Sequence, residues 1–411
     1  MSAAALLRVD RERLWASLME MARIGATANG GVTRLALSDE DKAGRDLFVR
    51  WAQELGCRIR IDAMGNIFAR YAGTDETLAP VLTGSHGDSQ PQGGRFDGIY
   101  GVLAGIELLR SLRDAGIRPR RSIEVVNWTN EEGSRFAPAM IGSGVACGVF
   151  DLEYGLSRTD RDGRSLGEEL QRIGYAGEGL PALQVHAAFE LHIEQGPILE
   201  AEGLTIGVVT GGQGQRWYEG QFIGQAAHAG TTPMERRRDA SLGLAELILL
   251  VNRIGLGVAP DGRATVGSAR LTPNSRNVVP GRAEFTVEFR HPDADVLVEM
   301  DSRLREGIRE IGARLRLEAA LEQVFSYAPI AFAPHCVERV RDASERLGYP
   351  YRHMISGAGH DVLYVSRLAP SAMIFVPCVD GISHNEAEDI HPEWAAAGAD
   401  VLLQAVLGAA A

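Results

Sequence analysis

The sequence predicts a two-domain α/β fold, in which a mostly parallel sheet is interrupted by an inserted α+β domain. Strand and helix patterns alternate in the N-terminal half and again near the C-terminus, as is typical of a parallel sheet covered by helices. The segment between them has a different order, β-α-β-β-α-β. The length of 411 residues exceeds what one ordinary core holds, and 45% hydrophobic with 23% charged residues is a normal globular balance. Two folded domains are therefore expected.

Apolar residues at helical spacing predict two helices at the start of the chain, over 14–21 and 43–55, and Gly56 is a candidate C-cap for the second. The other elements of the first domain then alternate between strand and helix. In chain order they are a strand at 81–85, a helix at 102–112, strands at 122–128 and 187–193, a helix at 335–347, a strand at 372–377 and a helix at 394–407.

The middle segment matches the element order of a ferredoxin-like unit. Its elements are a strand at 217–224, a helix at 241–254, strands at 264–271 and 284–289, a helix at 296–311 and a strand at 314–324. The glycine-rich residues 211–214 and the stretch at 328–334 are the candidate junctions. We therefore assign residues 1–211 and 328–411 to the first domain and residues 212–327 to the inserted domain.

Composition excludes several classes of function. The net charge is −12, from 54 acidic against 42 basic residues, so a nucleic-acid partner is not expected. Lys42 is the only lysine, which removes phosphate-loop and Schiff-base lysine chemistry elsewhere in the chain. No signal-peptide layout and no apolar run of membrane-spanning length is present, so we expect a soluble cytoplasmic protein without membrane contact. The scattered Cys57, Cys147, Cys336 and Cys378 indicate reduced, buried thiols, with two distant disulfides as the alternative.

Polar clusters follow or end predicted strands, where ligands of α/β sheets collect. There are five of them, at residues 84–88, 95–98, 129–133, 190–194 and 381–386. Together they supply histidines and carboxylates, the ligands that suit Zn²⁺, Mn²⁺ or Co²⁺. A single pair of this kind more often belongs to a solvated loop or a capped helix. Five clusters at strand ends are harder to explain in that way.

Two pairs within these clusters suggest a division of roles. Asp88 lies two residues after His86 and is placed to accept the second ring N–H, which would fix the histidine tautomer. Glu131 and Glu132 are neighbours, so one can bind metal while the other remains a free base. These pairs predict a metal-dependent active site.

The chain resembles a known family along most of its length, from about Asp10 to the C-terminus. The resemblance depends on seven segments in a fixed order: GSHGDSQPQGGRFDG, TNEEGSRF, ELHIEQGPILE, GQAAHAGTTPM, NVVPG, SGAGHD and DGISHNEAE. They resemble the dinuclear-metal amidohydrolases of the hydantoinase/carbamoylase family, within the M20-type metallopeptidases. That family contains N-carbamoyl-L-amino-acid hydrolases, β-ureidopropionases and allantoate amidohydrolases. The resemblance implies a metallopeptidase-like catalytic domain with an inserted domain that serves as lid and dimerisation surface.

Position by position, the resemblance implies a site with two divalent metal ions per subunit, drawn from Zn, Mn, Co or Ni. Asp97 would bridge them, His86 and His192 would complete one site, and Glu132 and His384 the other. A paired site of this kind activates water and stabilises a developing oxyanion.

The remaining implied roles concern catalysis and the peptide after the bridging residue. Glu131 would be the general base, and His228 would reach the partner subunit's site and bind the oxyanion. The bond between Asp97 and Gly98 would be cis, which is rare outside functional sites.

Further residues would bind substrate. Asn277 and Arg290 resemble the pair that holds the substrate carboxylate, a task that suits the planar guanidinium. Gln195, Gln215 and Gly357 would line the pocket. Without the resemblance, Arg290 is more often a strand-end ion-pair residue, Asn277 a turn residue and His228 an exposed turn histidine.

The resemblance therefore implies a homodimeric hydrolase of non-peptide C–N bonds in a small ureido acid. Its reaction would convert an N-carbamoyl-L-amino acid to amino acid, ammonia and CO₂. Allantoate amidohydrolase is the nearest alternative, and an aminoacylase, a dipeptidase or a non-catalytic ureido-acid binder are more distant ones. The sequence leaves open the substrate side chain, an α- or β-amino acid product, the physiological metal and an open or closed domain arrangement.

Overall fold

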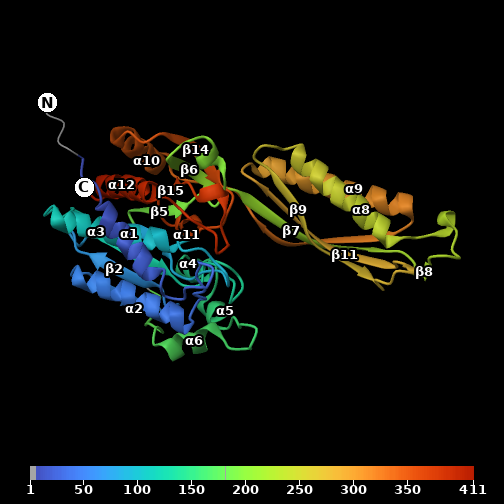
Figure 1. Cartoon of the computed structure of the whole chain (residues 1–411), viewed down its shortest axis with the longest axis horizontal. Helices are drawn as coiled ribbons and strands as arrows, with labels where there is room; N and C mark the ends of the chain where they lie inside the picture. The colour runs from blue at the N-terminus through green and yellow to red at the C-terminus, as the bar shows by residue number, and fades with distance from the viewer. Residues whose placement is uncertain (1–5, 181) are drawn as a thin grey trace. The chain divides into compact units, whose positions relative to one another are not determined.

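The computed structural model describes residues 6–180 and 182–411 and separates into two compact units (Figure 1). Unit 1 comprises the chain up to Gly211 together with Phe332–Ala411, and unit 2 comprises Gly212–Ala331. The two-domain α/β fold predicted from the sequence is confirmed.

Unit 1 contains a mixed sheet whose centre is parallel. Its strand order is β1-β2-β4-β3-β5-β15-β6-β13, and β14 also pairs with β6. Strands β4, β3, β5 and β15 run parallel to one another, whereas β1 with β2, β2 with β4 and β15 with β6 are antiparallel. The strands are β1 (Arg58–Ile61), β2 (Ile67–Tyr71), β3 (Val81–His86), β4 (Ile123–Trp128), β5 (Ala187–Ile193), β6 (Ile206–Gly212), β14 (Tyr351–Ser356) and β15 (Ser371–Val376). The two-residue strand β13 (Ile330–Ala331), which ends this strand order, comprises the last residues of the unit 2 range.

The four parallel strands are buried along their whole length, which explains why most of their residues are apolar. Thr83 and Glu190 are polar residues inside these strands. Helix α3 packs on β3 and β5, and α12 packs on β5 and β15. The helices of unit 1 are α1 (Arg11–Met21), α2 (Asp39–Glu54), α3 (Ile99–Asp114), α4 (Ile141–Ala146), α5 (Leu152–Leu156), α6 (Leu166–Ile173), α7 (Ile198–Ala201), α10 (Pro334–Leu347), α11 (Asp361–Val365) and α12 (Pro392–Ala409), with a 3₁₀ turn η2 (Val379–Gly381).

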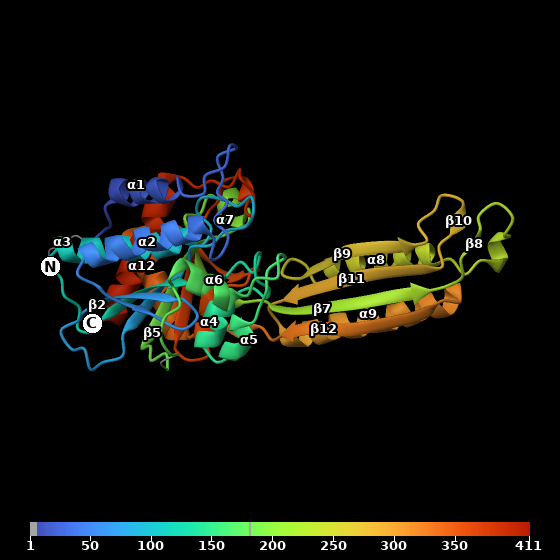
Figure 2. The ribbon, with the colours of Figure 1, turned by 90° about the horizontal axis from the view of Figure 1, so that it is seen from below.

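Unit 2 has the strand order β12-β7-β11-β9, antiparallel throughout, which is the ferredoxin-like arrangement (Figure 2). Residues alternate along β11 between buried and half-buried, and the buried ones pack with α8 and α9. Its elements are β7 (Gly214–Ile223), β8 (Ala227–His228), η1 (Met234–Arg236), α8 (Ala240–Leu256), β9 (Arg263–Thr272), β10 (Val278–Val279), β11 (Arg282–His291), α9 (Ala294–Leu315) and β12 (Glu318–Tyr327).

One predicted element begins in the wrong place. The strand expected at 314–324 starts only at Glu318, because Arg314 and Leu315 still belong to α9. Leu315 continues the helical spacing of Ile308 and Ile311, and the helix ends at Arg316 in a left-handed conformation, with φ of 57°. The apolar pattern of the helix therefore continues into the range predicted to be a strand.

The cysteines and the helices agree with two further expectations. All four cysteines are buried and free, so the disulfide alternative is wrong. Within the described ranges, none of the helices combines the length and apolarity needed to cross a bilayer.

Candidate metal centre and active site

Four adjacent parallel strands bring the candidate ligands to one edge of the sheet in unit 1. His86 is the last residue of β3, and His192 is the penultimate residue of β5. Val81 pairs with Ala187 and Thr83 with Phe189, and the same offset aligns His86 with His192. Glu131 and Glu132 follow β4, and His384 follows β15. These are the two outer strands of the parallel group. Since parallel strands end at the same edge, residues distant in the chain meet there.

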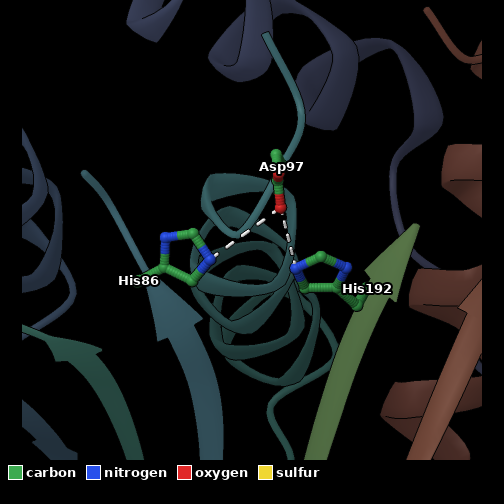
Figure 3. A group of neighbouring side chains, drawn as sticks. All are labelled: His86, Asp97 and His192. Atoms are coloured by element: carbon green, nitrogen blue, oxygen red, sulfur yellow. Dashed lines mark ion pairs between the residues drawn. The ribbon is translucent and has the colours of Figure 1, made fainter. Parts of the chain in front are cut away.

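Two buried histidines face one oxygen of Asp97 (Figure 3). The Nε2 atom of His192 lies 3.1 Å from Oδ1 of Asp97, and Nε2 of His86 lies 3.9 Å from the same oxygen. One ligand atom from each of the three side chains lies within 4.8 Å of the others. We refer to His86, Asp97 and His192 as site 1.

Hydrogen bonds fix the tautomers of both histidines in site 1. Nδ1 of His86 donates to the backbone carbonyl of Asp88 at 3.0 Å, and Nδ1 of His192 donates to the carbonyl of Ile193 at 2.9 Å. Each Nε2 atom therefore directs a lone pair toward the carboxylate of Asp97. An imidazole lone pair facing a carboxylate is stabilised only by positive charge between them, so this donor set fits a divalent cation.

A second group lies on the other oxygen of Asp97. His384 Nε2 is 3.2 Å from Oδ2 of Asp97 and 3.5 Å from Oε2 of Glu132. These three side chains also offer ligand atoms within 4.8 Å of one another. Glu132 is held by Gln90, whose Nε2 donates to it at 2.7 Å. We refer to Asp97, Glu132 and His384 as site 2, so Asp97 presents one oxygen to each site.

The pKa values of His86, His192 and Asp97 are shifted by burial and by one another. Burial lowers the pKa of His86 to about 4, so this ring is neutral. Burial opposes a charge on His192 most strongly, but the hydrogen bond to Asp97 and the negative charges of Asp97 and Glu190 together outweigh burial and raise the pKa to about 9. A proton on Nε2 then occupies the position between ring and carboxylate that a cation would take. Burial would raise the pKa of Asp97, yet the hydrogen bonds from His192 and His384 hold it well below its ordinary value.

Glu131 belongs to neither site but lies beside site 1, with Oε2 at 3.4 Å from Nε2 of His86. Burial, followed by the negative charges of Asp361 and Glu132, raises its pKa well above the ordinary value. A carboxylate with a raised pKa is better matched to general-base work near neutral pH.

Asp88 does not act as predicted. Its carboxylate oxygen lies 3.8 Å from Nδ1 of His86, whereas its backbone carbonyl accepts the ring N–H. The carboxylate instead accepts the backbone N–H groups of Glu131 at 3.2 Å and Glu132 at 3.3 Å. The tight turn after β3 points the carbonyl at the ring and frees the side chain to hold the loop that carries the glutamates.

The predicted cis bond after Asp97 is also wrong. Within the described residues, cis peptides occur at Ala137–Pro138, Ala259–Pro260 and Thr272–Pro273. Gly98 turns the chain by another route, with φ of 67° and ψ of −56° at the N-terminus of α3. Its N–H donates to Nε2 of His192 at 3.2 Å. A positive φ at glycine makes the turn without an isomerised bond.

Three non-glycine residues near the sites adopt left-handed backbone conformations. They are Asn130 with φ of 56°, Gln195 with φ of 55° and His384 with φ of 53°. Such conformations are unfavourable for most residues and concentrate at functional sites. Gln195 uses this turn to donate from Nε2 to Oδ2 of Asp97 at 3.0 Å. It therefore contacts the candidate ligand Asp97, and its predicted role of lining the substrate pocket stays a prediction.

The other predicted substrate residues are distributed over both units. Gly357 lies in the unit 1 loop between β14 and α11. Arg290 and Gln215 are register partners on β11 and β7, and Glu288 accepts from Nε of Arg290 at 2.7 Å and from the amide of Gln215.

His228 and Asn277 lie together at the opposite end of unit 2 from Arg290. Val278 pairs with His228, and the carbonyl of Asn277 accepts the N–H of Ala229 at 2.9 Å. Arg282 lies near β10 at the start of β11, and Arg290 lies near the end of β11. At about 3.3 Å per residue, the strand between these two residues is roughly 26 Å long. Within unit 2, the structure therefore does not bring Asn277 and Arg290 together.

His228 is exposed, and its tautomer is fixed by its own loop. Nδ1 accepts the backbone N–H of Gly230 at 3.0 Å and of Thr231 at 3.1 Å. The ring proton of the neutral form must then lie on Nε2, which makes that atom a hydrogen-bond donor.

The predicted ligand set did not include several buried groups around the sites. Glu190 accepts from Ser85 at 2.6 Å and from the N–H of Val362 at 2.9 Å, and the ring of His360 lies 4.6 Å from that of His192. Glu388 contacts the backbone of Asp97. These residues occur inside the quoted segments, but only their burial distinguishes them from the loop residues around them.

Comparisons with known proteins agree with this geometry. Residues 82–408 match the model of peptidase family M20/M25/M40. An N-carbamoyl-L-amino-acid amidohydrolase of Rhizobium meliloti is 50% identical over 401 residues, covering 97% of this chain and 96% of the relative. A hydantoinase/carbamoylase family amidase of Burkholderia multivorans has a solved structure with a TM-score of 0.95, 65% identity and 98% coverage of both chains. A ureidoglycolate hydrolase of Arabidopsis thaliana is 34% identical, covering 97% of this chain and 86% of the relative.

Proposed function

The chain belongs to peptidase family M20/M25/M40 and to its hydantoinase/carbamoylase branch, and on this basis we propose that it hydrolyses the carbamoyl C–N bond of N-carbamoyl-L-amino acids. The single observation that best supports the chemistry is the position of Asp97, whose two oxygens face two separate groups of ligands. A carboxylate shared in this way is the arrangement that a dinuclear hydrolase requires.

The metal content is part of the proposal. His86 and His192 would hold one cation, Glu132 and His384 the other, and Asp97 would bridge them. The mixed imidazole and carboxylate donors fit Zn²⁺, Mn²⁺, Co²⁺ or Ni²⁺. Such cations supply Lewis acidity to the attacking water and to the carbamoyl oxygen.

Glu131 performs the proton transfers in this scheme. It takes a proton from the attacking water as the new C–O bond forms at the carbamoyl carbon. It then returns that proton to the amino-acid nitrogen as the C–N bond breaks, and the released carbamate decomposes to ammonia and CO₂. Because the pKa of Glu131 is raised, the same group can accept the proton and give it back.

We also propose that two copies of the chain act together, and the positions of the unit 2 residues support this proposal. A substrate of a few ångströms cannot contact His228, Asn277 and Arg290 of the same copy, since about 26 Å of strand separates them. We propose that Arg290 binds the substrate carboxylate and that His228 of the partner subunit donates from Nε2 to the developing oxyanion.

A homodimer formed through unit 2 satisfies this requirement. Exposed leucines at positions 242, 249 and 256 recur every seven residues along one face of α8. An apolar stripe of this kind on a helix surface supports contact with a second copy. Unit 1 would then be the catalytic domain, and unit 2 the dimerisation and lid domain, of a cytoplasmic enzyme.

The experiment that tests the function is a substrate panel. The purified chain, reconstituted separately with Mn²⁺, Co²⁺, Ni²⁺ and Zn²⁺, would be assayed for ammonia release from N-carbamoyl-L-amino acids, their D-enantiomers, N-carbamoyl-β-alanine, allantoate and ureidoglycolate. We expect the highest kcat/KM with an N-carbamoyl-L-amino acid and none with its D-enantiomer. Faster hydrolysis of allantoate or ureidoglycolate would assign the chain to the alternative substrates, and metal binding without any ammonia release would indicate a binding protein.

A further inference from the structure

Glu388 is a buried carboxylate that belongs to neither metal site and yet holds parts of both. It is 1% exposed and lies four residues after His384. One carboxylate oxygen accepts the backbone N–H of Phe96 at 3.1 Å and of Asp97 at 3.0 Å, and the other accepts the hydroxyl of Ser383 at 2.8 Å. The same side chain therefore fixes the backbone of the shared aspartate and the residue that precedes His384.

The carboxylate has little freedom to take another position. A Cβ atom at Gly94 would lie 2.0 Å from it, so the loop before Asp97 closes directly over Glu388. Charge-assisted hydrogen bonds to a buried carboxylate are stronger than neutral ones, and they are not screened by water. Glu388 thus joins two segments that lie 291 positions apart in the chain.

A second connection between the same two segments is exposed and offers a comparison. Arg95 donates to Asp389 at 2.9 Å, and the side chain of Asp389 is 46% exposed. Ion pairs at such positions contribute little to stability. The buried connection through Glu388 is therefore the one expected to position the ligands.

The two sites differ in how firmly their ligands are held. The histidines of site 1 stand at the ends of buried strands and are almost completely buried. In site 2, the side chain of His384 is 51% exposed and its residue lies in a loop between η2 and α12. Site 2 therefore depends on loop contacts, whereas the sheet itself holds site 1.

We propose that Glu388 is a positioning residue that holds Asp97 and His384 in register, so that site 2 binds its cation tightly. This inference rests on the proposed dinuclear centre. Loss of such a supporting contact reduces metal affinity by about 10- to 100-fold. We expect the larger loss at site 2, where His384 lies in a loop, and a smaller loss at site 1, whose two histidines are held by the sheet.

The test compares Glu388→Ala, Glu388→Gln and the control Asp389→Asn in the full-length chain. Bound Zn²⁺ is counted by elemental analysis after dialysis, and dissociation constants are measured by competition with a chromogenic chelator. We expect two ions per chain in the wild type and in Asp389→Asn, but one tight ion and a weakened second ion in Glu388→Ala. Glutamine keeps an oxygen that can accept the two backbone N–H groups. The dissociation constant of the second ion in Glu388→Gln should therefore lie between those of the wild type and Glu388→Ala.

The outcomes separate the inference from the function on which it depends. Two tight ions in Glu388→Ala, or an equal loss in Asp389→Asn, would overturn the positioning role while leaving the metal centre in place. Absence of Zn²⁺ binding by the wild type would overturn both. If Glu388→Ala does not fold, as judged by circular dichroism, the Zn²⁺ dissociation constants of Glu388→Gln replace it in the comparison. A second ion bound as tightly as in the wild type would then overturn the positioning role. Recovery of kcat by excess metal in the alanine variant would further support a role in affinity.

Discussion

Gly98→Ala is the substitution whose effect the structure defines most closely. Gly98 follows the shared aspartate and starts α3, with φ of 67° and ψ of −56°. A Cβ atom there would lie 2.3 Å from Cε1 and Nε2 of His86, against an ordinary contact distance of at least 3.4 Å. The ring of His86, or the loop bearing Asp97, must therefore move by about 1 Å.

A movement of that size exceeds what coordination tolerates, because metal–ligand distances vary by only about 0.2 Å. We therefore expect Gly98→Ala to lose the cation of site 1. Misplacement of reacting groups by about 1 Å lowers turnover by about 100-fold, and the disfavoured backbone conformation costs about 1–3 kcal/mol of stability. The measurements are metal content by elemental analysis, steady-state ammonia release and the melting temperature.

Gly116→Ala is the matched control at the other end of the same helix. Gly116 also has a positive φ, of 65°, but a Cβ atom there meets nothing within 4 Å. This variant incurs the backbone cost without the clash, so it should melt slightly lower while keeping both ions and its activity. The reasoning is refuted if Gly98→Ala retains two ions and near-wild-type turnover, or if Gly116→Ala loses as much activity.

Three further predictions concern the base, the substrate carboxylate and the protonation of the centre. Glu131→Gln should lower turnover by about 10²- to 10⁴-fold while elemental analysis still finds both ions, and loss of the ions instead would indicate a structural role. Arg290→Ala should raise KM for N-carbamoyl amino acids far more than it lowers kcat, because it removes binding energy; an unchanged KM would exclude Arg290 from the site. After chelation, the melting temperature should fall as pH rises from about 4.5 to 9, first through Glu388 and, above about 6.5, through His192. The pKa of Glu388 is raised by burial to about 7 and that of His192 by Asp97 to about 9, so the folded chain binds protons more tightly than the unfolded chain and loses this stabilisation on deprotonation. Reloading with Zn²⁺ should remove the slope, whereas a melting temperature that rises with pH would contradict it.

The sequence predicted elements well where burial leaves a simple pattern. The strand at 187–193 matches β5 to the residue, because both faces of a central parallel strand are buried and most of its residues are apolar. The strands β1, β2, β6 and β14 of the same sheet were not predicted. β1 carries two arginines in four residues, β6 contains three glycines in seven, and β14 alternates between half-buried and exposed residues along most of its length.

The sequence also indicated the chemistry, because metal ligands are restricted to a few residue types and parallel strands deliver them to one edge. The sequence could not distinguish a carboxylate that accepts hydrogen bonds from the backbone from a carboxylate that binds metal. Asp88 and Glu388 illustrate this limit, since each accepts backbone N–H groups that are brought close only by folding.

By itself, then, the sequence determined which candidate ligand atoms the strand ends carry, namely imidazole nitrogens and carboxylate oxygens. The tertiary structure alone decided how they are shared: one aspartate oxygen for each group of ligands, and Asn277 and Arg290 at opposite ends of unit 2. The physical reason is that ligand identity is a property of each side chain, whereas distance and burial depend on contacts between segments that are remote in the chain.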